Sequence, residues 1–212
     1  MGIAFHIPSS VEPLTFDDDF TGTNGDPWNT VKWDILSGSP EIQSNKGRQE
    51  VPGGGGGAQN VRAYHNYILP AGEFDIQADW DIVSNNPNGD YWVVTFMIFA
   101  QAGTATPPYD QFYFQLSRLY SQGAHRLRVS RYDGDPLQGG YQETANTATS
   151  GKFRFTRTAS NNLHGFWDVG GGWVEYWDTM WGTPATFEVQ LRAQNGNGNG
   201  EVVVDWDNLI SV

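Results

Sequence analysis

Apolar and polar residues alternate along much of the chain, which is the pattern of a strand that buries one face. The clearest case runs from residue 74 to residue 82. We expect one buried face made of Phe74, Ile76, Ala78, Trp80 and Ile82. The opposite, solvated face would carry Asp75, Gln77, Asp79 and Asp81. Residues 91–100 differ because they are apolar on both faces, which is typical of a central strand covered from both sides.

Shorter alternating segments predict further strands, at 111–119, 126–132, 152–158, 163–169, 185–193 and 201–212. Ser121-Gln122-Gly123 favours a hairpin turn between the first two of them. Segments rich in Asn, Asp, Gly and Pro predict turns or loops at 85–89, 133–136 and 195–200. Helical periodicity is hard to find anywhere, so the pattern predicts an all-β chain of short strands.

The composition favours short strands joined by tight turns. The chain of 212 residues holds 26 Gly and 11 Pro beside 12 Phe, nine Tyr and nine Trp, which indicates many tight turns and many strand-favouring side chains. This length suits one sandwich domain. We expect residues 1–13, which contain Pro8 and Pro13, to form an extended arm, and 14–212 to form that domain. Residues 53–57 are all glycine and predict a loop tip.

Charge and sulfur content exclude several classes of partner and site. Lys and Arg number 12 against 24 Asp and Glu, so the net charge is −12, and such a chain repels the phosphate backbone of nucleic acid. The absence of cysteine excludes a disulfide framework, a zinc-thiolate site and a thiol nucleophile. No apolar run approaches the roughly 20 residues that span a bilayer. Residues 1–10 lack the basic and apolar regions of a secretory signal.

Several motifs resemble the concanavalin A-like lectin and glucanase superfamily, in particular its laminin G-like jelly-roll modules. The first is Phe16-Asp17-Asp18-Asp19-Phe20-Thr21-Gly22, followed by Asp26 and Trp33. Others are Phe153-Arg154-Phe155-Thr156-Arg157-Thr158, then 165–173, and finally 203–212 at the end of the chain. The resemblance covers about 14–212 and implies an all-β, antiparallel two-sheet jelly-roll β-sandwich whose first and last strands are neighbours. Since this superfamily holds lectins, glycosidases and purely structural modules, the fold alone does not give the function.

The acidic stretch 73–77 is the sharpest catalytic candidate. Glucanases of the superfamily carry a Glu-x-Asp-x-Glu strand, with a nucleophile first and a general acid last. Here Glu73 and Asp75 fit, but Gln77 stands at the position of the acid, and an amide cannot donate a titratable proton. The glucanase motif also normally follows the strand that resembles 91–100, whereas this one precedes it. The histidines His6, His65, His125 and His164 are scattered singly. We therefore predict a non-catalytic protein.

Aromatic and polar residues at outward positions predict a carbohydrate-binding surface. Aromatic rings stack on the apolar faces of sugars, while amides, carboxylates and guanidinium groups fix the hydroxyls. By strand parity the candidates that share an outward face are Asp79, Tyr113, Gln115, Arg128 and Tyr132. Trp173, Trp177 and Trp181 would form its rim. Trp80 and Trp206 are expected in the core, with Trp28 and Trp33 at the sandwich ends.

The resemblance also implies one structural calcium ion where the terminal strands meet. Calcium prefers six to eight oxygen ligands, several of them from carboxylates. Asp17 and Asp19 lie at one side of that junction, and Asp205 and Asp207 lie in the last strand. These four residues are the candidate ligands.

The prediction for function is a non-catalytic, surface-exposed recognition or structural module. A lectin-like jelly roll that begins at Met1 without a secretory signal suits a phage virion protein, a decoration, tail or fibre component. Its partners would be a glycan, neighbouring virion subunits or further copies of this chain in a homo-oligomer, with no nucleic acid and no membrane span. The arm 1–13 would dock onto a neighbouring subunit, or would be a disordered tail. The alternative is an extracellular carbohydrate-binding module or a glucanase-type glycoside hydrolase.

Overall fold

Fourteen β-strands form the described part of this computed structural model, which covers residues 15–53, 57–85, 91–100, 113–132, 140–160, 162–180, 186–196 and 200–212. Of residues 176–180 it describes the backbone only. The predicted arm 1–13 lies outside these ranges, as do parts of the predicted loops at 53–57 and 195–200. Among the described residues, no helix is long and apolar enough to cross a membrane.

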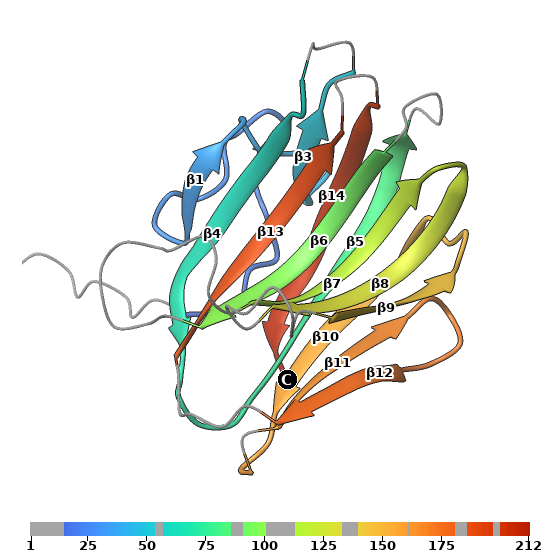
Figure 1. The fold of residues 1–212 in the computed structure, drawn as a ribbon. Coiled ribbons are helices and arrows are strands. Elements are labelled where there is room, and N and C mark those ends of the chain that lie inside the picture. The colour runs from blue at the N-terminus through green and yellow to red at the C-terminus, as the bar shows by residue number, and fades with distance from the viewer. Residues whose placement is uncertain are drawn as a thin grey trace, which may run out of the picture.

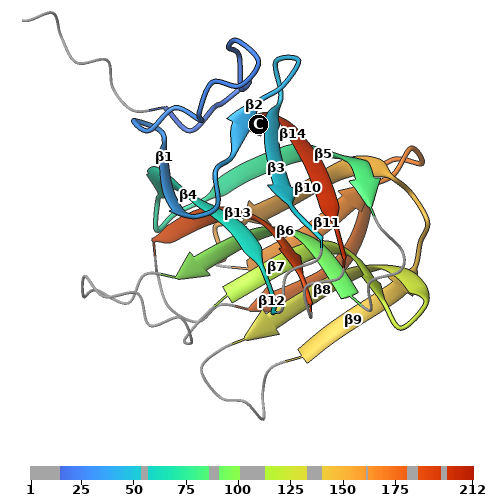
Figure 2. The ribbon, with the colours of Figure 1, turned by 90° about the horizontal axis from the view of Figure 1, so that it is seen from above.

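Seven antiparallel strands form what we call the front sheet (Figure 1). From edge to edge they are β1 (Trp33–Ser37), β4 (Asn60–Leu69), β13 (Phe187–Asn195), β6 (Tyr91–Ala100), β7 (Tyr113–Ser121), β8 (Ala124–Tyr132) and β9 (Gly140–Ala145). Figure 2 shows β4, β13, β6, β7 and β8 running side by side as one layer.

The other seven strands form the back sheet, which is also antiparallel. In order they are β12 (Val174–Met180), β11 (Asn162–Asp168), β10 (Ser150–Arg157), β5 (Phe74–Asn85), β14 (Val202–Ser211), β3 (Gly47–Val51) and β2 (Glu41–Ile42). The fold is therefore the predicted all-β sandwich of two antiparallel sheets.

The alternation in the sequence predicts the faces of β5 correctly. Ile76, Ala78 and Trp80 are buried between the sheets, while Asp75 and Asp79 lie half-buried on the outside. In β6 both faces are covered, as predicted for a central strand. The turn between β7 and β8 is the predicted hairpin, and Gln122 and Gly123 have φ angles of 51° and 79°. Positive φ at both central residues is what a type I′ hairpin turn requires.

Aromatic side chains join the two sheets. Phe96 of β6 and Phe114 of β7 both contact Phe155 of β10, with ring centroids 5.1 and 5.2 Å apart. A buried hydrogen-bond chain crosses the same space, because Gln49 accepts from Trp206 Nε1 at 3.0 Å and donates to the carbonyl of Leu191 at 3.2 Å. The core thus combines ring packing with a fully paired polar link.

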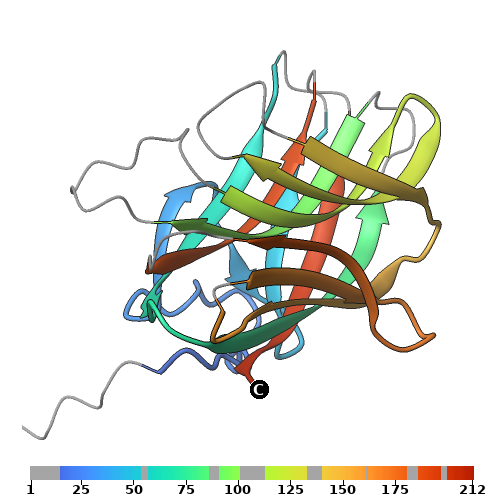
Figure 3. The ribbon, with the colours of Figure 1, turned by 60° about the horizontal axis from the view of Figure 1, so that its bottom comes forward.

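The first and last described segments pair with each other, as the resemblance implies. The Asp18 amide donates to the Leu209 carbonyl at 2.7 Å, and the Leu209 amide donates back at 3.1 Å. Asp17 accepts from the Ser211 amide at 2.7 Å. Figures 2 and 3 show the segment after residue 14, drawn in blue, beside the end of β14. The two ends of the domain are therefore joined directly by backbone hydrogen bonds.

An aromatic cluster closes the sandwich next to this pairing. Trp28 and Trp33 are each 1% exposed, as predicted for residues at a sandwich end, and their ring centroids lie 4.9 Å apart. Phe20 packs on both of them. The Trp33 indole donates to the buried Asp18 carboxylate at 2.6 Å. We call Phe16, Phe20, Trp28 and Trp33 the aromatic cap.

Candidate functional site

Four of the predicted binding residues lie together on the outer face of the front sheet, which we call the front face. In the strand register Tyr113 stands opposite Tyr132, and the next outward pair in β7 and β8 joins Gln115 to Ser130. Arg128 stands opposite Ser117 farther along. Because Phe114 and Leu116 point into the core, these intervening residues must point outward.

A row of aromatic rings crosses the front face at one end. Tyr64 of β4 contacts Phe99 of β6, and their centroids are 5.6 Å apart. Phe99 contacts Tyr113 at 6.3 Å, and Tyr113 stacks on Tyr132 at 5.6 Å. We call these four residues the aromatic row. It extends over five strands, or about 20 Å at the usual strand spacing.

Hydrogen-bonding side chains form the next row along the strands. By register it runs from Gln190 of β13 through Met97 to Gln115 and Ser130. Gln190 is 2% exposed and Ser130 is 8% exposed, yet Gln190 Nε2 and Ser130 Oγ have no hydrogen-bond partner in the structure as described. A buried donor without a partner costs free energy unless a ligand or water satisfies it.

A charged row follows, made of Arg192, Thr95, Ser117, Arg128 and Glu143 in register order. Glu143 accepts hydrogen bonds from Arg126 at 2.7 Å and from Arg128 Nε at 2.6 Å. Burial opposes the charge on this carboxylate, but the two arginines outweigh it and lower the pKa of Glu143. Arg128 also lies over the Tyr141 ring, 4.8 Å from its centroid.

The middle of the front face is buried although it lies on the outside of the sandwich. Ser117 and Thr95 are 0% and 2% exposed although they point away from the core, and Leu119 is equally buried. By contrast, Asp75, Gln77 and Asp79 on the outer face of the back sheet are only half-buried. The outward side chains of β6 and β7 are therefore more deeply buried than those of β5.

The prediction that Asp79 belongs to this face is wrong, because β5 lies in the back sheet. Asp79 contacts Lys152 at 3.3 Å and accepts a hydrogen bond from Asn208 at 3.0 Å. Trp173 is also on the back sheet, where Arg154 lies over its ring at 5.5 Å. The backbone of Trp177 pairs with Gly165 of the same sheet, and Trp181 lies outside the described residues.

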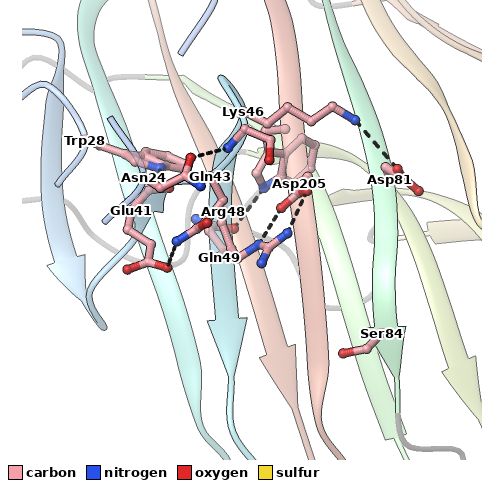
Figure 4. A network of polar contacts seen from close by, with 12 residues as sticks. Asn24, Trp28, Glu41, Gln43, Lys46, Arg48, Gln49, Asp81, Ser84 and Asp205 are labelled. Atoms are coloured by element: carbon pink, nitrogen blue, oxygen red, sulfur yellow. Dashed lines mark hydrogen bonds and ion pairs between the residues drawn. The ribbon is translucent and has the colours of Figure 1, made fainter. Parts of the chain in front are cut away.

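The acidic face of β5 is neutralised by cations of neighbouring strands. Arg154 donates to Asp75 at 2.7 Å, and Lys46 lies 3.7 Å from Asp81. Figure 4 shows the second of these pairs beside the paired Arg48 and Asp205. The Glu-x-Asp stretch that resembled a catalytic motif is thus part of a salt-bridged outer surface.

The four predicted calcium ligands do not converge. Asp205 is held by Arg48, with Nε 2.7 Å from its Oδ1, and the hydrogen bond to Asp205 raises the pKa of Arg48. Asp17 and Asp19 instead accept hydrogen bonds from the nearby backbone. Asp207 lines a depression of about 390 Å³ on the back sheet with Asp205. Throughout the described ranges, no three His, Asp or Glu side chains form a group that could hold a metal ion. These residues do not fit the implied ion.

Alternation alone did not single out several residues of the front face. Tyr64 and Arg62 lie in β4, and Gln190 and Arg192 lie in β13. The signal that could have found the last two is the run 187–194, where polar residues alternate with Phe187, Val189, Leu191 and Ala193. Their place beside β6 depends on a pairing that spans much of the chain.

No family model and no curated protein sequence matches the chain. Its fold is similar to that of a laminarinase from Flavobacterium sp. UMI-01, with a TM-score of 0.66, 12% identity, and 93% of this chain and 99% of that chain covered. It is also similar to a legume lectin-like domain from Entamoeba histolytica, with a TM-score of 0.58, 11% identity, and 85% and 92% covered.

A third similar structure is an immunostimulatory antigen and pseudo beta-1,3-glucanase of Mycobacterium tuberculosis. Its TM-score is 0.57 at 10% identity, with 93% of this chain and 99% of that chain covered. At such identities the likeness concerns the fold alone. Together with the two seven-stranded antiparallel sheets, it shows that the chain has the concanavalin A-like β-sandwich fold.

Proposed function

We propose that this chain is a non-catalytic carbohydrate-binding module that holds an oligosaccharide on its front face. The observation that carries the proposal is the aromatic row beside the unpaired, buried donors of Gln190 and Ser130. Rings offer flat apolar surfaces for sugar rings, and the donors can bind sugar hydroxyls. A row about 20 Å long suits several linked sugars better than one.

We propose that the protein is non-catalytic because the middle strands of the front face present no pair of carboxyl groups among the described residues. Glycoside hydrolysis needs a pair of carboxyl groups beside the scissile bond. Within the described residues, β6 and β7 present no carboxylate outward, because β7 shows Tyr113, Gln115 and Ser117 where the glucanase motif would stand. Glu143 of β9 has a lowered pKa and is held by two arginines, which makes it a poor general acid.

A pair of matched aromatic substitutions tests binding. Tyr113→Ala should weaken the affinity for the best ligand of a glycan array at least about tenfold, as expected for a ring contact worth about 1.4 kcal/mol. Trp173→Ala removes an exposed ring from the back sheet and should leave the affinity unchanged. Near-UV circular dichroism checks the fold of both variants. An array without any bound glycan, or equal losses in the two variants, would contradict the proposal.

Incubation with β-1,3- and β-1,4-glucans tests the non-catalytic part. No reducing ends should be released by the parent protein. Release that disappears in Glu143→Gln or Glu188→Gln would favour the alternative, a glucanase-type hydrolase.

We further propose a surface-exposed setting, such as a phage particle, for this module. Only the sequence supports this setting, through the proline-containing segment 1–13 and the resemblance to modules of virion proteins. The alternative setting is an extracellular carbohydrate-binding module.

A further inference from the structure

The front face is rich in arginine although the chain carries a net charge of −12. Among described residues its strands present Arg62, Arg126, Arg128 and Arg192 outward, against Asp34, Glu143 and Glu188. The lysines Lys32, Lys46 and Lys152 lie elsewhere, next to aspartates. Arginine presents a planar fork of donors that matches carboxylate and sulfate groups better than the point charge of lysine does.

Two of these arginines lie on either side of the buried Thr95 and Ser117. The register places Arg192 beside Thr95, Thr95 beside Ser117, and Ser117 beside Arg128. The two small hydroxyls are 3.3 Å apart and buried. Three strand spacings, about 14 Å, separate the two arginine backbones, a gap that two long side chains can bridge together with one small anionic group.

Two tyrosines of the front face flank the level of Thr95 and Ser117, Tyr91 opposite Ser121 and Tyr113 opposite Phe99. Burial raises the pKa of Tyr91 and of Tyr113, while the charges of Arg128 and Arg192 act against that rise at each hydroxyl. The tyrosines stay protonated there and can donate hydrogen bonds.

Among the described residues, Arg192 has no carboxylate partner, in contrast to Arg48 and Arg154 of the back sheet. Burial and the neighbouring charge of Arg62 lower the pKa of Arg192. Its Nε atom is buried without a hydrogen-bond partner among the described residues, although one Nη atom donates to Gln194. Like charges on opposed strand positions are destabilising. An anion bound at this position would relieve both the desolvation and the repulsion.

We propose that the ligand of the front face is an acidic glycan, whose carboxylate or sulfate group lies between Arg192 and Arg128 above Thr95 and Ser117. This inference rests on the proposed function and narrows the class of its ligand. The aromatic row, four residues away along β7 or about 13 Å, would hold neighbouring sugar rings of the same chain.

Two pairs of polymers test the charge requirement. One pair is polygalacturonate and the same polymer with its carboxyl groups reduced to alcohols, and the other is dextran sulfate and dextran. In at least one pair the charged polymer should bind ten times more tightly or better, and raised salt should weaken that binding. The responding pair shows whether the anion is a carboxylate or a sulfate.

Charge-removing variants on opposite faces locate the anion. Arg192→Gln should lower the affinity for the responding polymer at least tenfold. Arg154→Gln removes a cation from the back sheet, where it pairs with Asp75, and should change the affinity less than twofold. Equal effects of the two variants would overturn the inference, and so would polyglutamate binding as tightly as the glycan.

The outcomes distinguish this inference from the proposed function. If neutral and charged polymers bind equally and Tyr113→Ala abolishes binding, the acidic ligand is wrong and the carbohydrate module stands. If neither charged polymer binds, the inference fails whatever the neutral ones do. If Tyr113→Ala has no effect on any glycan, the proposed function fails as well.

Discussion

His65 links the ionisation of one side chain to the folding of the whole domain. Its ring lies between Phe16 and Trp33, with centroids at 5.1 and 4.8 Å, and its Nδ1 accepts from the Tyr67 amide at 3.1 Å. Burial lowers the pKa of His65 from 6.5 to about 4, with Asp18 opposing and Lys32 adding to the shift. The folded protein therefore holds this ring neutral.

Acid should destabilise the fold through this residue. Between pH 6.5 and about 4 the unfolded chain binds a proton at His65 and the folded one does not, so stability is lost as the pH falls through this window. The loss attributable to the ring is about 3 kcal/mol. Denaturant unfolding at pH 7 and pH 4.5 measures it, and His65→Gln should show a smaller difference between the two.

The His65→Gln variant serves as the control, because the pH dependence of its unfolding free energy comes from the other titrating groups. His125 contributes in the same direction, because burial and Arg118 lower its pKa too. A lower stability of His65→Gln at every pH leaves this test intact, because the test concerns only the difference between the two pH values. An unchanged difference would show that His65 is not the group that responds.

The calcium prediction shows that the sequence around a carboxylate does not reveal its partner in the folded protein. The pattern Asp205-x-Asp207 has the acidity that a metal site requires. Its first carboxylate is instead satisfied by Arg48, a residue 157 positions away in the chain. Spacing along the chain indicates which carboxylates lie near one another. It does not indicate whether a side chain from a distant strand, such as Arg48, already pairs with them.

In β3, the glycine at position 47 leaves room for a neighbouring aromatic ring. A Cβ atom at Gly47 would lie 2.4 Å from Phe20 Cδ1, which is far closer than van der Waals contact. The buried ring of Phe20 thus packs directly on the backbone of this strand. The aromatic cap depends on this approach.

Gly47→Ala should therefore loosen the cap. Overpacking of this kind costs about 1–3 kcal/mol, or a melting temperature lower by roughly 3–10 °C for a domain of this size. Gly72→Ala is the control, since a Cβ there meets nothing within 4 Å. Thermal unfolding followed by tryptophan fluorescence compares the two, and equal melting temperatures would show that the ring moves aside freely.

Elements also explain why the predicted site was partly right. Alternation in β7 and β8 correctly predicts Tyr113, Gln115, Arg128 and Tyr132 as outward residues that share a face. The same reasoning applied to β5 places Asp79 outward, which is correct, but on the wrong sheet. A period of two tells which side of its own sheet a residue occupies. The sheet to which a strand belongs depends on its pairing with strands that are distant in the sequence. The alternation within one strand carries no information on that pairing.

For the whole molecule, the architecture was more predictable than the site. The double-sided apolar strand 91–100, the hairpin at 122–123 and the paired ends each follow from local patterns or from the resemblance, and all are confirmed. The aromatic row and Arg192 were out of reach because they are assembled from β4, β6, β7, β8 and β13. Only the completed sheet brings these strands side by side.

Two N-terminal deletions separate the arm from the cap. Removing 1–13 should leave the melting temperature unchanged, because the pairing with β14 begins at Asp17 and Asp18. Removing 1–20 takes away Phe16 and Phe20 and should lower it by about 10 °C or more. If the arm docks onto a neighbouring virion subunit, the shorter deletion should also abolish assembly, seen by light scattering. Unchanged assembly would contradict the docking role.

The pairing of Asp18 with Leu209 has a consequence for any larger assembly. Both ends of the domain leave the molecule at the same place, beside a strand of the back sheet. A fusion partner or anchoring chain attached at either end would therefore start from the side opposite the front face. Closely spaced ends also allow circular permutation and insertion into a host loop. Mounted in any of these ways, the domain would carry its arginine-rich face on the side away from the point of attachment.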